Sequence, residues 1–340
     1  MKVLVYSALR TVTLDDWPVP APGPDEVLLR VRATGICGSD LAGFLGYSPR
    51  RQPGLVLGHE TVGIVEAMPS DGEWPFQIGQ RVVVNPLMTC GYCDACLSGR
   101  TNLCAHWHLI GMDRLHGAFA EYVVVRATNV FPIPEDLPDV RAVMIEPLAN
   151  GVHLFTLITA RPFSTLALFG AGTQGCLLLL LARMLGYRDI AVVDVNPERL
   201  KVAAQLGARW TIHAGQADPV AAIHDCFGGN GADVVIDAHG DTAVRSACVN
   251  VVRKGGEVLL LGLHEVHSNV DFARVVRGEV RLQGSYAYTT QDFAQARKLV
   301  ESGSVDLSPW TEVLPLEAGQ TAFDRLTTDP GATVKIVLTP

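Results

Sequence analysis

Four cysteines between residues 87 and 113 have the spacing of a metal site. They form the pattern C-x2-C-x2-C-x7-C and are Cys90, Cys93, Cys96 and Cys104. Three thiolates, each separated from the next by two residues, and a fourth within reach suit a tetrahedral zinc ion. An iron–sulfur cluster is the alternative, but the last spacing differs from the bacterial ferredoxin pattern and alanine, not proline, follows Cys104. Because four protein ligands leave no position for substrate, we expect a structural zinc that braces this loop.

A second chemical motif is the glycine pattern G-x-G-x-x-G at Gly170, Gly172 and Gly175, directly after the apolar run 166–169. In this arrangement the first glycine makes a tight turn and the second lets the backbone approach a pyrophosphate. The third lets the following helix pack close to the strand. The amides that open this helix, at Thr173 and Gln174, are expected to face the phosphates. The motif therefore predicts dinucleotide binding.

An acidic residue in the right place supports this prediction. Asp194 closes a second apolar run, 190–193, and lies 19 residues after Gly175. Its carboxylate can accept hydrogen bonds from the adenosine ribose and repel a 2′-phosphate, which favours NAD over NADP. Arg199 is a weak counter-signal, more typical of a solvated helix charge than of a phosphate ligand. Leu261 and Leu263, at the end of a later strand, complete the predicted cofactor-binding residues.

The elements around the glycine motif predict the sheet that must position it. Apolar strands and helices alternate after residue 175, as a helix over 197–206, a strand over 233–237, a helix over 242–252 ended by Gly255 and Gly256, and a strand over 257–261. Such alternation is typical of a doubly wound parallel sheet.

The segments on either side predict a second, β-rich domain. Three strand-like runs with glycine and proline turns precede the glycine motif, at 26–33, 61–67 and 79–84. After Gly284 the chain has a helix over 292–301 and a closing strand over 332–338, too little to bury a core of its own. We therefore expect this tail to return to the first domain, giving an α/β protein of two domains.

Composition excludes several classes of protein. The chain has 340 residues, is 48% hydrophobic and carries a net charge of −8 without long blocks of like charge. This balance argues against nucleic acid or an anionic membrane as partner. The sequence has neither a signal-peptide pattern nor an apolar run of about 18 residues, so we expect a cytoplasmic protein. Its eight cysteines are then expected to be metal ligands or buried groups, not disulfides.

Three further motifs carry a resemblance to a known family. CGSD at 37–40, GHE at 58–60 and EP at 146–147, combined with the cysteine loop and the glycine motif, resemble the zinc-dependent medium-chain alcohol dehydrogenases over the whole chain. The resemblance implies a GroES-like catalytic domain at 1–150 and 286–340, and an NAD-binding Rossmann domain at 151–285. It also implies a homodimer or homotetramer, with subunit pairing expected in the region 259–284.

The family's catalytic zinc is carried over through these motifs. The resemblance implies that Cys37, His59 and a carboxylate from Glu60 or Glu146 hold it, with one position open, and the sequence does not decide which carboxylate binds directly. Simple alcohol dehydrogenases tend to have cysteine at the position of Glu146. The glutamate at this position resembles the polyol and threonine dehydrogenase branch. The implied reaction is hydride transfer from a secondary alcohol to NAD, giving a ketone, with two zinc ions per chain and a small-molecule substrate.

A proton path is also implied, but its exit is missing. In the family, the hydroxyl at Ser39 starts a relay through the nicotinamide ribose that commonly ends at a histidine five residues after the first ligand. That position is Ala42. Water or another group must then carry the proton; candidates are His106, His108, His116 and His264.

The leading hypothesis is oxidation of a polyol, sugar alcohol or related sugar derivative. Threonine is disfavoured because Ala42 and the segment 86–89, PLMT, lack histidines that threonine dehydrogenases commonly have, and because 111–122 and 284–286 follow the pattern of sugar-alcohol enzymes. A sugar phosphate would need a cationic pocket, which Arg50, Arg51 or Arg114 could supply. A non-catalytic NAD-binding zinc protein is disfavoured because the full set of implied catalytic residues is present: Cys37, Ser39, His59, Glu60 and Glu146.

Overall fold

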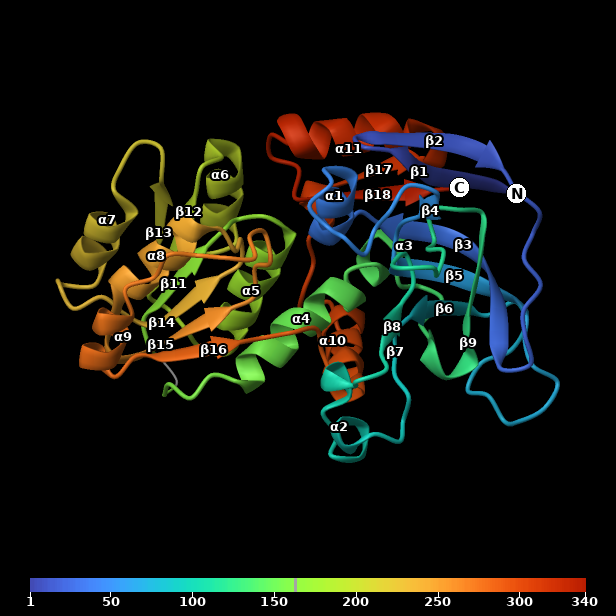
Figure 1. The fold of residues 1–340 in the computed structure, drawn as a ribbon, viewed down its shortest axis with the longest axis horizontal. Helices are drawn as coiled ribbons and strands as arrows, with labels where there is room; N and C mark the ends of the chain where they lie inside the picture. Colours follow the sequence, from blue (N-terminus) through green and yellow to red (C-terminus); the bar gives the residue numbers. More distant parts are fainter. Residues whose placement is uncertain (162–163) are drawn as a thin grey trace. The chain divides into compact units, whose positions relative to one another are not determined.

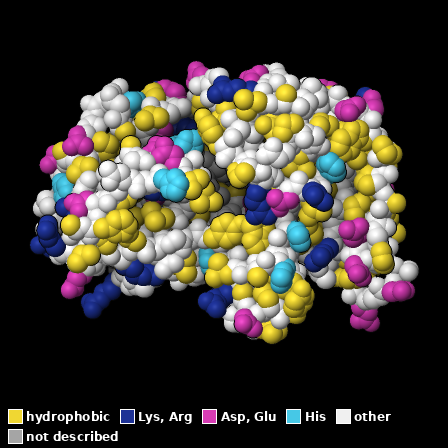
Figure 2. Space-filling view, viewed as in Figure 1, with side chains coloured by type: hydrophobic (Ala, Val, Ile, Leu, Met, Phe, Trp, Pro, Cys, Tyr) yellow, Lys and Arg dark blue, Asp and Glu magenta, His cyan; other side chains and the backbone are white. Residues whose placement is uncertain are grey.

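The computed structural model describes residues 1–161 and 164–340, which divide into two compact units (Figure 1). Unit 1 comprises Met1–Ala149 and Tyr288–Pro340, and unit 2 comprises Asn150–Ala287. Within the described ranges, no helix has the length and apolar character needed to cross a bilayer. Figure 2 shows acidic and basic side chains interspersed on the visible surface, consistent with the absence of charge blocks in the sequence.

Unit 1 is built around a mixed seven-stranded sheet. Its order is β10-β6-β5-β3-β18-β17, and β9 also pairs with β3. The bounds are β3 Glu26–Gly35, β5 Glu60–Ala67, β6 Arg81–Val84, β9 Tyr122–Arg126, β10 Val130–Pro132, β17 Thr311–Pro315 and β18 Lys335–Thr339. A three-stranded sheet contains β1 Lys2–Ala8, β2 Thr11–Asp16 and β4 Leu55–Val56, and a two-stranded one contains β7 Leu87–Met88 and β8 His108–Leu109.

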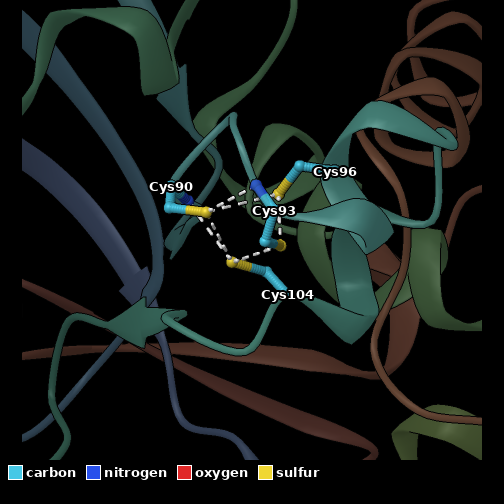
Figure 3. A group of neighbouring side chains, drawn as sticks. All are labelled: Cys90, Cys93, Cys96 and Cys104. Atoms are coloured by element: carbon cyan, nitrogen blue, oxygen red, sulfur yellow. Dashed lines mark hydrogen bonds between the residues drawn. The ribbon is translucent and has the colours of Figure 1, made fainter.

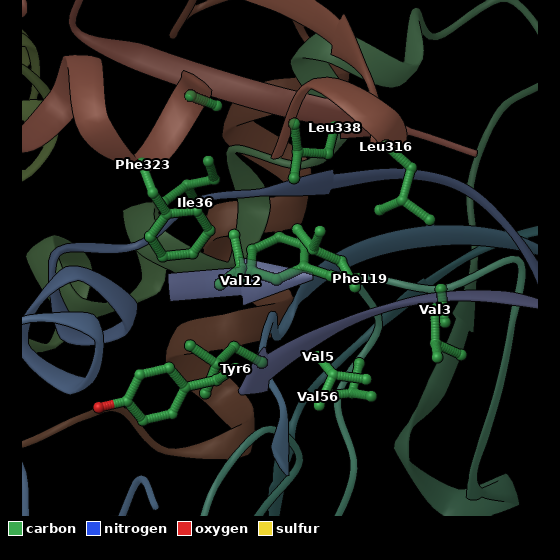
Figure 4. Packing of buried hydrophobic residues seen from close by; sticks show 14 of the residues in the cluster. Val3, Val5, Tyr6, Val12, Ile36, Val56, Phe119, Leu316, Phe323 and Leu338 are labelled. Carbon is green, nitrogen blue, oxygen red and sulfur yellow. The ribbon is translucent and has the colours of Figure 1, made fainter. Parts of the chain in front are cut away.

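The C-terminal strand lies inside the larger sheet of unit 1. β18 runs antiparallel to β3 and parallel to β17, so the last residues of the chain are flanked on both sides. Side chains from both ends of the sequence share one core, and Figure 4 draws Val3, Tyr6 and Phe119 of this cluster together with Phe323 and Leu338. The Phe119 and Phe323 rings meet edge to face, with centroids 5.9 Å apart.

Short helices complete unit 1. They are α1 Gly38–Phe44, α2 Asp94–Leu97, α3 Asp139–Ala142, α10 Thr290–Glu301 and α11 Gly319–Thr328, with 3-10 turns at Thr101–Leu103, Ala127–Asn129, Ser308–Trp310 and Leu316–Ala318. α4 Ile145–Thr156 begins in unit 1 and continues into unit 2.

Unit 2 is the predicted doubly wound parallel sheet. Its order is β13-β12-β11-β14-β15-β16, with all neighbours parallel. The strands are β11 Leu166–Phe169, β12 Ile190–Asp194, β13 Trp210–His213, β14 Ala232–Asp237, β15 Val252–Leu260 and β16 Arg281–Gly284. The helices are α5 Thr173–Met184, α6 Pro197–Gln205, α7 Pro219–Cys226, α8 Thr242–Val251 and α9 Phe272–Gly278.

Both faces of this sheet are covered, which explains the uniformly apolar strands. Leu166 and Leu168 of β11 pack in one core with residues of α5 and α6, and Ala167 and Phe169 pack in the other with residues of α7 and α8. Successive side chains of a strand point to opposite faces, so a strand buried on both sides must be apolar throughout. The predicted fold class is confirmed.

One element assignment from the sequence is wrong. Gly255 and Gly256 were expected to end a helix over 242–252, with a strand beginning at 257. Instead α8 ends at Val251 and β15 already begins at Val252. The two glycines lie within β15 at a bulge, where the register against β14 shifts, and Gly255 adopts a φ of 70°. A glycine in the left-handed region serves a bulge as well as it serves a helix end.

Two other predicted boundaries are also corrected. The helix predicted over 292–301 begins earlier, at Thr290, because Thr289 caps it: the Thr289 hydroxyl accepts from the Asp292 amide, and Asp292 accepts from the Thr289 amide. The strand predicted over 332–338 begins only at Lys335, because the chain first makes a turn in which the Thr333 amide donates to the Pro330 carbonyl.

Candidate active site

The four sulfurs of the cysteine loop, residues 87–113, converge on one point (Figure 3). Four of their separations are 3.9 Å for Cys90–Cys96, 3.6 Å for Cys93–Cys96, 3.9 Å for Cys93–Cys104 and 3.5 Å for Cys90–Cys104. A zinc ion with bonds of about 2.3 Å to four tetrahedral sulfurs requires sulfur separations of about 3.8 Å. The sulfurs thus fit one zinc ion. An iron–sulfur cluster needs room for several iron and sulfide ions, which would spread them further apart.

Backbone amides surround these sulfurs. The Cys90 and His106 amides each donate to Cys104 Sγ at 3.3 Å, and the Cys93 amide donates to Cys90 Sγ at 3.4 Å. Hydrogen bonds from the Cys96 and Ala105 backbone lower the pKa of Cys93 to about 6. Donors aimed at a sulfur stabilise the thiolate, which is the form that binds metal.

Strand register assembles the second candidate metal site, in unit 1. Gly35 of β3 lies opposite Glu60 of β5, and Val337 of β18 lies opposite Gly35. Since both pairs are antiparallel, Cys37, two residues beyond Gly35, is brought towards Gly58 on one side and Lys335 on the other. Three segments far apart in sequence therefore meet where β3 ends.

The predicted ligands Cys37, His59 and Glu60 come together at this point. One ligand atom from each lies within 4.8 Å of the others, and His59 and Glu60 are 4% and 0% exposed. Within the described ranges, the buried oxygen Glu60 Oε1 has no hydrogen-bond partner. A buried carboxylate oxygen of this kind is costly unless a cation neutralises it. A soft thiolate, an imidazole and a carboxylate form a donor set that suits zinc.

Asp40 lies behind His59. Its buried carboxylate has Oδ1 3.5 Å from His59 Nδ1, and Oδ2 accepts the Cys37 amide at 3.0 Å. Burial alone would lower the pKa of His59, but Asp40 and Cys37 raise it well above its usual value. Within the described residues His59 Nδ1 makes this ion-pair contact but no hydrogen bond. A carboxylate beside one ring nitrogen orients the ring and favours the other nitrogen as a metal ligand.

Lys335 holds the other side of the cluster. It is 1% exposed, forms an ion pair with Glu60 Oε2 and donates to the Ile36 carbonyl at 3.0 Å. Gly35 has no room for a side chain, because a Cβ there would collide with the Glu60 carboxylate and lie 2.8 Å from Lys335 Cε. The glycine at the end of β3 therefore permits this buried ion pair.

Glu146 is also buried here, on the first turn of α4. It is 4% exposed, and the Tyr288 hydroxyl donates to its Oε1 at 2.7 Å. Burial, together with the nearby Glu60 carboxylate, raises the pKa of Glu146 to about 7. Glu146 is not in the group of three whose ligand atoms converge within 4.8 Å. The geometry thus separates the two carboxylates that the sequence leaves equivalent: Glu60 belongs to the converging group and Glu146 lies beside it.

Ser39, the predicted start of a proton relay, has an unexpected partner. Its Oγ accepts a hydrogen bond from Nη2 of Arg51 at 3.0 Å. His116, one of the predicted relay substitutes, instead accepts the Val56 amide and packs edge-on against Trp17. His106 stacks on Tyr92, and His264, in unit 2, stacks on His239. His108 lies exposed in β8.

The glycine motif of unit 2 has the geometry of a phosphate-binding turn. Gly170 has a φ of 104°, and a Cβ on Gly175 would collide with the Gly170 carbonyl oxygen. Beside Gly172, an added Cβ would have only Arg199 Nη1 nearby, at 3.8 Å. The first glycine makes the turn, the third allows helix and strand to approach, and the second leaves space over the backbone. Thr173 and Gln174 open α5.

Asp194 and Arg199 both lie against this turn. Asp194 accepts the Ala171 amide at 2.6 Å through Oδ2 and the Asn196 amide at 2.8 Å through Oδ1. Arg199, on α6, is partly buried and lies beside Gly172. Leu261 is partly buried at the carboxyl end of β15, and Leu263 is 77% exposed.

Four residues near the candidate metal ligands have positions that the sequence does not predict: Asp40, Arg51, Tyr288 and Lys335. Two of them, Asp40 and Lys335, can be recognised by a pattern in the sequence. Asp40 follows Cys37 by three residues, the spacing of a helix capping box, and Lys335 is a charge inside the apolar run 334–338. The positions of Arg51 and Tyr288 depend on how the chain folds back, which no local pattern specifies.

Comparison with known proteins agrees with this architecture. Residues 23–135 match the alcohol dehydrogenase GroES-like domain, and residues 175–302 match the zinc-binding dehydrogenase domain. Sorbitol dehydrogenase of Bacillus subtilis (strain 168) is 33% identical, covering 100% of this chain and 97% of the relative. L-threonine 3-dehydrogenase of Xanthomonas axonopodis pv. citri (strain 306) is also 33% identical, covering 99% of each.

Two solved structures that are similar to this chain are also described as dehydrogenases. A Sinorhizobium meliloti 1021 protein described as a zinc-binding dehydrogenase, bound to NADP, has a TM-score of 0.90 at 29% identity, covering 100% of this chain and 99% of that one. Galactitol-1-phosphate dehydrogenase from Escherichia coli has a TM-score of 0.90 at 26% identity, covering 100% of both. The chain belongs to the zinc-dependent medium-chain alcohol dehydrogenase family. It is an oxidoreductase that acts on CH–OH groups.

Proposed function

We propose that this protein oxidises a secondary alcohol of a polyol, sugar alcohol or related sugar derivative to a ketone, with NAD as hydride acceptor. Cys37, His59 and Glu60 would hold the catalytic zinc, and Glu146 would act through water. The observation that carries the proposal is the buried convergence of these three donors, with a second carboxylate beside them. Cys90, Cys93, Cys96 and Cys104 would hold a structural zinc.

A zinc ion at this site would supply Lewis acidity, which lowers the pKa of a substrate hydroxyl towards neutrality. The protein's own groups orient the reaction. Asp40 fixes the ring of His59, and Lys335 anchors one oxygen of Glu60. Ser39, partly exposed two residues after Cys37, would accept the proton of the alcohol on a lone pair and pass its own hydrogen to the nicotinamide ribose, from which water would carry the proton away. The Tyr288 hydroxyl donates to Glu146 Oε1 and so orients this second carboxylate.

The pair of buried carboxylates supports a polyhydroxylated substrate. Carboxylates are strong hydrogen-bond acceptors, and a polyol offers several donors close together. Threonine is the second candidate, because a threonine dehydrogenase and a sorbitol dehydrogenase are equally similar to this chain and because carboxylates would also attract an ammonium group. The missing histidines at residue 42 and in the segment 86–89 favour the polyol.

A phosphorylated polyol is a less favoured variant of the same proposal. Arg50 forms two bonds with Asp113, at 2.9 and 2.5 Å, and its guanidinium lies 4.0 Å from the centre of the Trp107 ring. Arg51 is 4% exposed and contacts Ser39. Of the three arginines considered for a phosphate pocket, only Arg114 is exposed.

The decisive experiment is a screen of NADH and NADPH production. Purified, zinc-replete protein would be tested with polyols, polyol phosphates, butanediol and L-threonine, with His59→Ala as the inactive control that keeps the structural zinc. We expect the highest kcat/KM with a polyol and NAD. L-threonine oxidised as efficiently as the best polyol would contradict the substrate proposal, and a fully active His59→Ala variant would contradict the site. Cytoplasmic location and homo-oligomeric assembly remain predictions.

A further inference from the structure

The region beside the candidate catalytic metal site contains a buried arginine that no catalytic motif accounts for. Arg51 lies between α1 and β4 and is 4% exposed. Its Nη2 donates to Ser39 Oγ at 3.0 Å, and its Nε lies 3.6 Å from Asp40 Oδ1. One guanidinium thus connects the hydroxyl proposed to accept the proton with the carboxylate behind His59.

The fold makes room for this side chain. Gly43, on the inner side of α1, lies directly against it: a Cβ at residue 43 would be 2.6 Å from Arg51 Cδ and 2.8 Å from Arg51 Cβ. Any larger residue at position 43 would displace the arginine. The glycine and the arginine therefore form one packed unit behind Ser39.

The chemistry of the guanidinium restricts the Ser39 hydroxyl. A serine hydroxyl has one proton and two lone pairs, whereas arginine has only donors and keeps its charge at all physiological pH values. Arg51 can therefore occupy a lone pair of Ser39 but can never accept its proton. The Ser39 hydrogen must point away from Arg51, which leaves it, with the second lone pair, on the partly exposed side of the serine.

We infer that Arg51 is a positioning residue, which fixes the Ser39 hydroxyl so that it exchanges protons only on its substrate side. This inference rests on the proposed dehydrogenase function. It also gives a reason why the chain has arginine at this position. The planar guanidinium donates to Ser39 through one nitrogen and faces Asp40 with another, whereas a lysine ammonium would have to contact both residues through a single nitrogen.

A double-mutant cycle tests the inference. Arg51→Met and Arg51→Lys would be made in the wild type and in Ser39→Ala, and kcat, KM, zinc content and Tm would be measured with the best substrate of the screen. We expect Arg51→Met to lower kcat on the order of tenfold to a hundredfold, a range typical of disturbed proton transfer, with KM within about threefold. Arg51→Lys should lie between Arg51→Met and wild type.

The Ser39→Ala background identifies the route of the effect. If Arg51 acts through the serine hydroxyl, its replacement should lower kcat by less than about threefold once that hydroxyl is absent. Arg30→Met is the matched control, because Arg30 forms a surface pair with Glu66 at 2.5 Å on β3; it should leave kcat unchanged.

Three outcomes would overturn the inference. One is an equal loss of kcat in both backgrounds, another is a wild-type kcat for the zinc-replete Arg51 variants, and the third is loss of zinc or folding in both variants, which would assign Arg51 a structural role. A wild-type protein that binds two zinc ions but oxidises no alcohol would instead refute the proposed function, and with it this inference.

Discussion

A single carboxylate, that of Asp40, connects most of the groups behind the candidate catalytic site. Oδ1 lies 3.4 Å from the Gly58 amide, 3.5 Å from His59 Nδ1 and 3.6 Å from Arg51 Nε, while Oδ2 accepts the Cys37 amide. Burial would raise its pKa, but His59 and Arg51 lower it below the usual value. The carboxylate is therefore charged and orients the segments that carry two of the proposed ligands.

We predict that Asp40→Asn weakens zinc binding at the catalytic site about 10- to 100-fold, because a neutral amide no longer fixes the His59 ring as a carboxylate does. Competition with a chromogenic chelator measures this affinity. Asp113→Asn removes a carboxylate that pairs with Arg50 at the surface and serves as control. Equal zinc affinity of Asp40→Asn and wild type would contradict the role of Asp40.

A second prediction at this scale concerns the cofactor. Asp194→Ala should narrow the preference for NAD over NADP by about tenfold or more, because it removes the carboxylate that repels a 2′-phosphate and leaves the Arg199 guanidinium beside Gly172. The ratio of kcat/KM values for the two cofactors measures the effect. A wild type without preference would show that Arg199 outweighs Asp194.

Individual site residues can be predicted from the sequence only where they belong to a short functional motif. Cys37, His59 and Glu60 belong to short patterns, and the structure brings these three side chains together, whereas the sequence suggests Arg51 only as a phosphate ligand. Its actual contacts depend on a space left by Gly43, eight residues earlier, on a different element. A space of this kind has no local sequence signature.

Among the elements, the segment of the cysteine loop from Cys90 to Cys104 is unusual because it buries almost no apolar side chain. Tyr92 is 68% exposed, Leu97 74% and Leu103 51%, and α2 has only four residues. Hydrophobic burial therefore contributes little to its stability, and metal binding has to replace it. The sequence predicts this element well, because four ligands within 15 residues need no long-range contact to be recognised.

We predict that Cys93→Ser removes one zinc per chain and lowers Tm by about 5–10 °C, corresponding to a few kcal/mol of lost metal binding. Metal analysis and differential scanning calorimetry measure both effects. The control is Cys226→Ser, at the end of α7, which should change neither. A Cys93→Ser protein with two zinc ions and unchanged Tm would refute the structural site.

The parallel sheet of unit 2 offers a pH-dependent contact at its amino-terminal edge. Asp233, on β14, accepts the Thr165 amide and hydroxyl, both at 2.7 Å, and pairs with Arg253. Burial would raise the pKa of Asp233, but these bonds lower it below its usual value. The contact is therefore stabilising above the unfolded-state pKa of about 4 and is lost as the pH falls through the lower folded-state value.

We accordingly predict that Asp233→Asn lowers Tm by about 2–4 °C at pH 7, because the charge-assisted bonds are weakened. The difference between variant and wild type should shrink as the pH falls below 4. Thermal unfolding over a pH series tests this. A constant difference at all pH values would mean that the charge of Asp233 contributes nothing.

At the scale of the molecule, the two units bury separate cores. Unit 1 draws on both ends of the chain, whereas unit 2 is one continuous segment with two cores, one on each face of its sheet. The alternation of strands and helices let the sequence predict unit 2. The sequence could not give the strand order of unit 1, because β18 inserts between β17 and β3, and the end of β3, Gly35, precedes β18 by 300 residues.

We predict that residues 150–287, expressed alone, fold cooperatively and bind NAD, because their sheet and helices are complete in one segment. Circular dichroism and calorimetric NAD titration measure this, and the same segment with Gly172→Val, which blocks the space over the glycine turn, is the control for binding. A fragment that folds but shows no affinity for NAD would contradict the assignment of the glycine motif.

The position of β18 also has a consequence for synthesis of the protein. Residues 90–104 emerge from the ribosome together, so the cysteine loop can capture its metal while the chain is still growing. Lys335, which anchors Glu60, follows the cysteine loop by more than 200 residues and is translated much later. Because growing chains fold from the amino terminus, the cysteine loop can fold well before the catalytic pocket is complete. The two zinc ions should therefore be acquired in a fixed order, the structural ion first.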